Sequence, residues 1–198
     1  MNFQQVLNKY REECFSERDK GTRFETLMKY YLKTDPMYSN EFSEIWLWSE
    51  FPFRSQFGGK DIGIDLVAKE VEGGYTAIQC KCYRETARID KPEVDTFLST
   101  SGKSFEDEDG KLCAFTHRLW ISTTNKWTDV AEDTLKNQNP PVNRIVLQCL
   151  KMLRLIGSKS TKESMERKQE LAKKLQGHTK QQLLKNVMNI LPLTIEES

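Results

Sequence analysis

Three side chains suited to phosphodiester hydrolysis lie on two neighbouring apolar segments. Asp65 lies in the segment 61–69, and Gln79 and Lys81 lie in the segment 75–83. Successive side chains of a strand point to opposite faces, so Gln79 and Lys81 share a face. A buried ammonium needs a partner, and the Gly73-Gly74 turn brings Asp65 back towards it. The pattern predicts a carboxylate, an amide oxygen and an ammonium close together.

This group of side chains suits a hard divalent cation. Mg²⁺ prefers oxygen ligands, keeps several waters and typically uses one or two carboxylates. We expect direct contacts from Asp65, the Gln79 side chain and the Cys80 carbonyl, with Glu25 bound directly or through water, and we expect Mn²⁺ to substitute. The metal would acidify a water, and Lys81 would orient that water and stabilise charge on phosphorus.

Basic residues flank the same segments. We expect Arg54, Lys60 and Arg84 to hold the backbone of a nucleic acid. A competing interpretation makes Asp65 and Lys81 a buried structural ion pair. Glu25 also has a structural alternative, because Thr22 to Glu25 fits a capping box at the start of a helix.

The remaining pattern predicts an α/β fold, with a central mixed β-sheet flanked by helices. Apolar spacing indicates a helix over 1–20 broken at Lys20-Gly21, and a second helix from Thr22 to Asp35-Pro36. Charged residues predict an unpacked loop from Ser104 to Lys111. Further helices are expected from Pro92 to about Thr100 and over 127–136, and strands over 44–50, 61–69, 75–83, 117–123 and 143–149.

Charge divides the chain into two expected domains, 1–150 and 151–198. The chain has a net charge of +1, which separates into −4 before residue 151 and +5 after it. The second part has the pattern of a basic helical hairpin, and its charge has a plain alternative reading as a solvated helix face. No apolar run is long enough to span a bilayer, no secretory signal is visible, and five cysteines fit reduced thiols, so we expect a cytoplasmic protein with no membrane partner.

The pair Cys80-x-Cys82 raises the alternative of a zinc site. Both side chains are expected on a core face of their strand, and no second pair with ligand spacing accompanies them. Buried cysteines that behave as small apolar residues explain the pair better.

The segments GIDLVA and AIQCKCY, separated by a Gly-Gly turn, resemble the PD-(D/E)xK nuclease superfamily in its Mrr-like branch, where Gln replaces an acid. FETLMKYYLKTDP, EIWLWSE and THRLWISTTNKW resemble the N-terminal nuclease domain of type ISP restriction enzymes and predicted helicases. The resemblance implies a restriction-endonuclease-like core, α-β-β-β-α-β, and Mg²⁺-dependent DNA cleavage by Asp65, Gln79 and Lys81. Glu25 matches the helix-borne acid, and Asp61 matches an accessory acid.

The resemblance also implies a place in restriction or anti-phage defence, with helicase or methyltransferase modules in the same or a neighbouring chain. Two alternatives remain open: a DNA-binding or regulatory module that keeps the fold without cleaving, and an enzyme like a junction resolvase. Cutting both strands requires two such sites, so a homodimer is expected.

Overall fold

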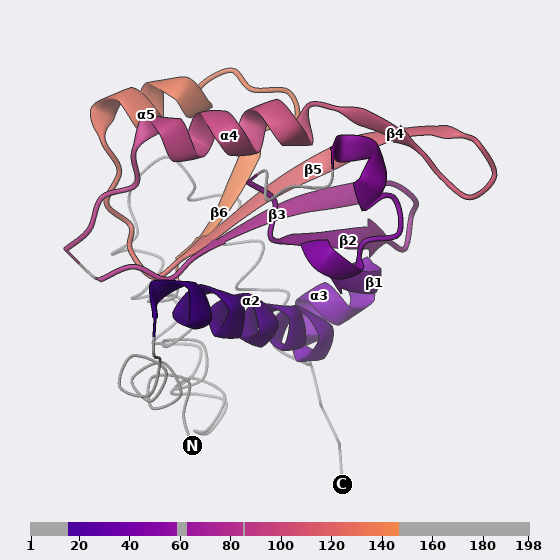
Figure 1. Cartoon of the computed structure of the whole chain (residues 1–198), viewed down its shortest axis with the longest axis horizontal. Coiled ribbons are helices and arrows are strands. Elements are labelled where there is room, and N and C mark those ends of the chain that lie inside the picture. The colour runs from indigo at the N-terminus through magenta and orange to yellow at the C-terminus, as the bar shows by residue number, and fades with distance from the viewer. Residues whose placement is uncertain (1–15, 59–62, 85, 147–198) are drawn as a thin grey trace, which may run out of the picture. The chain divides into compact units, whose positions relative to one another are not determined.

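A mixed sheet carries the fold, with helices on both of its faces (Figure 1). The structure is a computed structural model and describes residues 16–58, 63–84 and 86–146. The α-helices are α2 (Glu17–Thr34), α3 (Pro36–Glu41), α4 (Lys91–Ser101) and α5 (Asp129–Leu135), with short 3-10 turns η1 (Trp48–Glu50) and η2 (Arg54–Phe57). The strands are β1 (Phe42–Leu47), β2 (Leu66–Glu70), β3 (Tyr75–Lys81), β4 (Ser104–Glu106), β5 (Leu112–Ser122) and β6 (Val142–Val146).

The strands combine an antiparallel meander with a parallel half. Strands β1, β2 and β3 pair in order and antiparallel, and β3 then pairs parallel to β5. The long strand β5 pairs antiparallel with β4 at its beginning and parallel with β6 further along. The expected mixed sheet is thereby confirmed, and β3 lies in its interior with neighbours on both sides.

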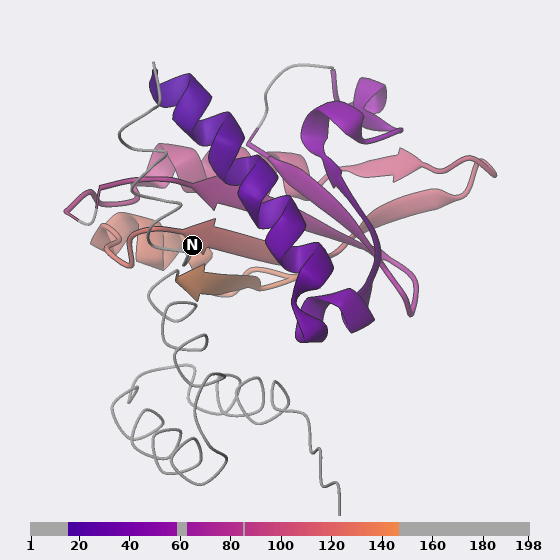
Figure 2. The ribbon, with the colours of Figure 1, turned by 90° about the horizontal axis from the view of Figure 1, so that it is seen from below.

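Both faces of β3 are covered, so almost every side chain of that strand is buried. Helix α2 crosses one face of the sheet (Figure 2) and buries Phe24, Met28 and Leu32. Helices α4 and α5 cover the other face over a largely aromatic core that contains Phe97, Phe105 and Trp120. An interior strand with helices on both sides of the sheet is buried on both faces, which is why Gln79 is buried as well as Cys80.

The first described helix begins earlier than predicted. Ser16 is the N-cap of α2, and its hydroxyl accepts a hydrogen bond of 3.1 Å from the Asp19 amide. Gly21 and Thr22 lie within the helix, so the predicted break and the capping box at Thr22 to Glu25 are both wrong. The cost of one helical glycine, about 1 kcal/mol, is small beside the burial of three large apolar side chains further along α2.

A short strand also replaces part of a predicted loop. Ser104–Glu106 forms β4, and Phe105 between its charged or polar neighbours is 1% exposed. That side chain packs against aromatic rings from several segments, including Phe51, Phe53 and Tyr75. One buried aromatic residue therefore anchors a segment whose composition indicated a solvated loop.

The other expected elements that fall on described residues are present, but some of their bounds differ. The strand expected over 44–50 ends at Leu47, where η1 begins, β2 begins only at Leu66 rather than at 61, and β5 begins at Leu112 rather than at 117. The turn at Gly73-Gly74 has φ angles of 91° and 110°, which favour glycine. The expected helix over 1–20 lies mostly outside the described residues, and the expected helical hairpin over 151–198 lies entirely outside them. Within the described residues, no helix is both long enough and apolar enough to cross a membrane.

Candidate active site

Asp65 lies just before β2, where that strand separates from β3. Its amide donates to the Ile78 carbonyl at 2.9 Å, and its carbonyl accepts from the Trp48 amide at 2.7 Å. The backbone of Asp65 is therefore bonded on both sides, which fixes the direction of the side chain. Because β2 begins only at Leu66, the Asp65 carboxylate takes the place of a strand partner beside the end of β3.

The Asp65 carboxylate accepts two hydrogen bonds from β3. Its Oδ2 accepts from the Cys80 backbone amide at 2.6 Å and from the Gln79 side-chain nitrogen. Gln79 is only 2% exposed. The sequence prediction that Asp65 meets Gln79 is confirmed at the level of this contact.

The second polar atom of the Gln79 amide is a buried acceptor with no partner. Its Oε1 is buried and makes no hydrogen bond in the described structure. Leaving such an atom unsatisfied costs about 1–3 kcal/mol. A buried, unpartnered amide oxygen on a residue bonded to a carboxylate has the chemistry of an oxygen ligand for a cation.

Lys81 points towards the layer formed by α4. Its Nζ lies 3.8 Å from Glu93 Oε1, and the side chains of Lys81 and Glu93 are 27% and 25% exposed. Glu93 belongs to the first turn of α4 and also accepts a hydrogen bond from the Tyr83 hydroxyl. Lys81 thus forms an ion pair with Glu93, a carboxylate that was not among the predicted site residues.

The pKa of the buried Cys80 thiol responds to charges on several elements around the site. Burial raises the pKa of the Cys80 thiol well above its usual range, and the carboxylates of Asp65 and Glu25 raise it further, whereas Lys81 lowers it. Glu25 on α2, Asp65 and Lys81 therefore all act on one buried thiol. Glu25 lies well inside α2, so the alternative that it completes a capping box at Thr22 was wrong.

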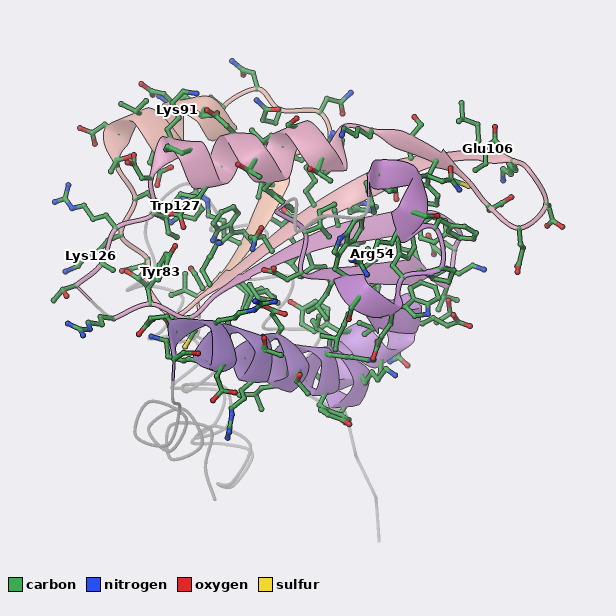
Figure 3. All side chains as sticks on the ribbon, viewed as in Figure 1. Arg54, Tyr83, Lys91, Glu106, Lys126 and Trp127 are labelled. Carbon is green, nitrogen blue, oxygen red and sulfur yellow. The ribbon has the colours of Figure 1, made fainter. Side chains whose placement is uncertain are left out.

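The other predicted site residues are placed less centrally. Arg54 is half-buried on η2, and Figure 3 shows it away from Tyr83, which follows the end of β3. Arg84 is exposed, and its charge helps to lower the pKa of Glu17 at the start of α2, after the larger effect of Lys20. Lys60 and Asp61 lie outside the described residues.

The donor set fits an oxygen-liganded cation better than zinc. Among the described residues, no group of three or more His, Cys, Asp or Glu side chains is arranged to hold a metal. Cys80 and Cys82 are buried, at 6% and 9% exposed, and a raised thiol pKa disfavours the thiolate that zinc requires. The oxygens of Asp65, Gln79 and Glu25 are the hard ligands available here.

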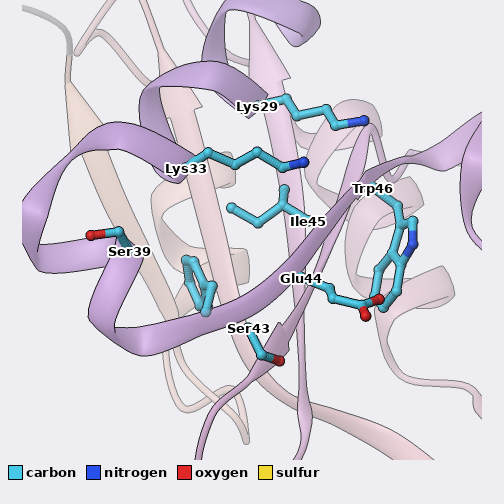
Figure 4. Close-up of a pocket in the computed structure, with 8 residues that line it drawn as sticks. Lys29, Lys33, Ser39, Ser43, Glu44, Ile45 and Trp46 are labelled. Atoms are coloured by element: carbon cyan, nitrogen blue, oxygen red, sulfur yellow. The ribbon is translucent and has the colours of Figure 1, made fainter.

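A hollow of about 550 Å³ lies elsewhere, between α2, α3 and β1 (Figure 4). Lys29 and Lys33 approach it from α2, and Lys29 is paired with Glu50. None of the predicted catalytic residues lines it, so it is separate from the site around Asp65.

Glu93 and Tyr83 are neighbours of the site that were not predicted from the sequence. Asp90 and Glu93 form a capping box at the start of α4, and that spacing is visible in the sequence. That spacing predicts the start of a helix. It does not predict that the Glu93 carboxylate lies near Lys81, because that contact depends on how α4 packs beside the end of β3.

Comparison with known proteins gives two kinds of result. A family profile described as a restriction endonuclease matches residues 33–166. Comparison with the curated proteins found no significant match.

Two solved structures are similar. One is an ATP-dependent type ISP restriction-modification enzyme, LlaBIII, bound to DNA, with 29% identity and a TM-score of 0.57 over 76% of this chain and 8% of that chain. The other is the MspJI restriction endonuclease in complex with a 27-mer oligonucleotide, with 16% identity and a TM-score of 0.45 over 89% of this chain and 35% of that chain. That second similarity is too weak to add to the argument.

This chain spans less than a tenth of the type ISP enzyme that it resembles. The family profile covers well over half of the chain and includes β1 through β6, with Asp65, Gln79 and Lys81 among the matched residues. The chain therefore belongs to the restriction endonuclease family, as a Mrr-like member of the PD-(D/E)xK nucleases.

Proposed function

We propose that this chain is a metal-dependent endonuclease module that hydrolyses DNA phosphodiesters, with Mg²⁺ as its ion and Mn²⁺ as a substitute. The observation that carries the proposal is the buried, unpartnered Oε1 of Gln79 beside the Asp65 carboxylate. Membership of the restriction endonuclease family supports hydrolysis as the use of that site. A purely structural role for Asp65 as a hydrogen-bond acceptor for β3 gives no reason for an unsatisfied acceptor on Gln79.

Asp65, Gln79 Oε1, the Cys80 carbonyl and Glu25 would hold the ion. When bound, the ion would acidify a water and offset the charge of the phosphate. The two hydrogen bonds that Asp65 Oδ2 accepts from β3 hold that carboxylate in one orientation, which reduces the reorganisation needed during reaction. Gln79 is held in turn by its own bond to Asp65.

Lys81 would act on the reacting groups directly. Its ammonium is partly exposed at the end of β3 and can donate to the attacking water or to a phosphate oxygen. During hydrolysis the attacking water gives up one proton to solvent as its oxygen bonds to phosphorus, the bond from phosphorus to the leaving sugar oxygen breaks, and the leaving oxygen takes up a proton from solvent. Lys81 would stabilise the extra negative charge on the phosphate oxygens as this happens.

DNA is the proposed substrate, and restriction or anti-phage defence is the proposed setting. Arg84 near the start of α2, with Arg54 and Lys60, is proposed to hold the DNA backbone, and Asp61 is proposed as an accessory acid of the site. Because the type ISP relative is a much longer enzyme, we also propose that helicase or methyltransferase modules in the same or a neighbouring chain deliver the DNA, and that two copies cut the two strands.

A substrate panel tests the proposal. The full chain would be incubated with supercoiled plasmid, linear duplex, single-stranded DNA and a four-way junction, with Mg²⁺, with Mn²⁺ and with EDTA. We expect cleavage of duplex DNA that requires the metal. Preference for the junction would replace the proposed substrate with that of a resolvase, and binding without cleavage in either metal would overturn the enzymatic proposal.

A further inference from the structure

The two carboxylate oxygens of Glu93 make different contacts. Oε2 accepts from the Asp90 backbone amide at 3.2 Å and so completes the capping box of α4. Oε1 accepts from the Tyr83 hydroxyl and lies 3.8 Å from Lys81 Nζ. Capping a helix requires only one of these oxygens, so the cap does not explain the second set of contacts.

The surroundings of Glu93 are tied to the sheet at several points. The Tyr83 amide donates to Thr123 Oγ1 at 2.6 Å, and Thr123 donates back to the Tyr83 carbonyl at 2.6 Å. At the start of α4, Asp90 accepts from Thr128, the N-cap of α5, at 3.1 Å. The two hydrogen-bond partners of Glu93, Tyr83 and Asp90, are thus themselves bonded to Thr123 and Thr128. These bonds fix the position of the Glu93 carboxylate beside the Lys81 side chain.

The length of the Lys81–Glu93 contact matters for what Lys81 can do. At 3.8 Å the pair is within ion-pair range but beyond a normal hydrogen bond, which lies near 2.9 Å. The carboxylate can therefore attract the ammonium without occupying its donors. Tyr83 donates its hydroxyl to the same oxygen, Oε1, and so helps to hold the Glu93 carboxylate in place beside Lys81.

We propose that Glu93 is a positioning residue that holds the Lys81 ammonium at the end of β3 with its donors free for the attacking water or a phosphate oxygen. The effect of this positioning on catalysis rests on the proposed function, in which Lys81 acts on the reacting groups. The placement of Lys81 itself does not depend on cleavage, and that part can be measured in the protein without DNA.

A matched pair of variants separates positioning from helix stability. Glu93→Gln removes the charge that attracts Lys81 but keeps an oxygen that can complete the capping box, since Glu and Gln both serve at that position. Asp95→Asn removes the same charge from the same helix, where Asp95 pairs with Lys91 instead. The full chain would be used throughout, at a temperature where both variants are folded.

Two measurements decide the proposal. In steady-state DNA cleavage with Mg²⁺, we expect Glu93→Gln to lower kcat by about 10- to 100-fold with little change in KM, the range found for residues that orient a site group, whereas Asp95→Asn stays near wild type. In ¹³C relaxation of the Lys81 Cε methylene, assigned by its loss in Lys81→Met, we expect a lower order parameter in Glu93→Gln than in either wild type or Asp95→Asn.

An unchanged Lys81 order parameter in Glu93→Gln, or an unchanged kcat in an active enzyme, would overturn the proposal. If the wild-type chain does not cleave DNA at all, the proposed function fails, and the relaxation result still decides whether Glu93 holds Lys81.

Discussion

Gln79 donates its side-chain amide to Asp65 and keeps its own oxygen buried and unpartnered. Gln79 lies on β3 and Asp65 lies just before the neighbouring strand β2. A second bond from the Cys80 backbone amide fixes the same carboxylate oxygen of Asp65. An arrangement that leaves a buried acceptor unsatisfied costs stability unless something else binds it. We therefore propose that the pair serves as a ligand set rather than as a structural bridge.

Metal binding should stabilise the protein through this pair. A ligand present at a hundred times its dissociation constant adds about 2.7 kcal/mol to the free energy of unfolding, so Mg²⁺ or Mn²⁺ should raise the wild-type Tm in a concentration-dependent way. Gln79→Met replaces the amide with an apolar side chain of similar size, and we expect the metal-dependent rise in Tm to disappear.

Gln56 offers a matched control for that experiment, because it is a glutamine on η2 that bonds the backbone of Glu106 at 2.8 Å in both directions. Gln56→Met should lower the Tm without metal and keep the rise that metal produces. An equal metal-induced rise in Gln79→Met and wild type would exclude Gln79 as a ligand.

The start of α2 gives a test of helix capping. Ser16→Ala removes the hydroxyl that accepts from the Asp19 amide, which should cost about 1 kcal/mol of unfolding free energy. Thr22, the cap expected from sequence, lies within the helix and donates to the Arg18 carbonyl, so Thr22→Ala should be close to neutral. Urea unfolding of the two variants measures both values, and the reverse ranking would mean that α2 begins at Thr22.

The contact between Asp65 and Gln79 could be predicted because it depends on local features. The Gly73-Gly74 turn, the alternation along 75–83 and the position of Asp65 in an apolar run all lie within one hairpin of the sequence. Such features determine which side chains of adjacent strands meet. The mixed sheet was likewise predictable from the order of the elements.

The parts that were missed depend on packing between distant segments. Gly21 weakens a helix locally, and only the burial of Phe24, Met28 and Leu32 against the sheet explains why α2 continues through it. Phe105 shows no strand signal until its aromatic partners are known. Glu93 meets Lys81 across 12 positions of sequence because α4 docks at the end of β3.

The pair Glu132–Arg144 predicts a pH effect on stability away from the site. Arg144 donates from Nη1 and Nη2 to the two Glu132 oxygens at 2.8 and 2.7 Å and lies 4.2 Å from the ring centre of Trp127. The hydrogen bonds and charge of Arg144 hold the pKa of Glu132 below its ordinary value of 4.5, against the opposing effect of burial. A lowered pKa in the folded state stabilises the fold above pH 4.5 and ceases to do so as the pH falls through the folded-state value.

We therefore expect Glu132→Gln to lower the free energy of unfolding at pH 7 by up to about 1 kcal/mol, since the pair is partly exposed. The difference from wild type should shrink as the pH is lowered from 4.5 towards 3. Urea unfolding at several pH values measures it, and Glu108→Gln, in the exposed turn between β4 and β5, gives the charge control. A difference that is constant with pH would rule out the ion pair as its source.

Single-turnover cleavage of duplex DNA by wild type, Asp65→Asn and Lys81→Met, each with Mg²⁺ and with EDTA, would show whether Asp65 and Lys81 form a metal-dependent nuclease site. Asp65→Asn keeps the size of the side chain and removes its charge, and circular dichroism would establish that both variants fold. We expect Mg²⁺-dependent cleavage by wild type that falls by about 100-fold or more in each variant, the scale set by losing one group that stabilises transition-state charge. Cleavage that persists in EDTA, or that is as fast in Asp65→Asn as in wild type, would contradict a metal-dependent site at these residues.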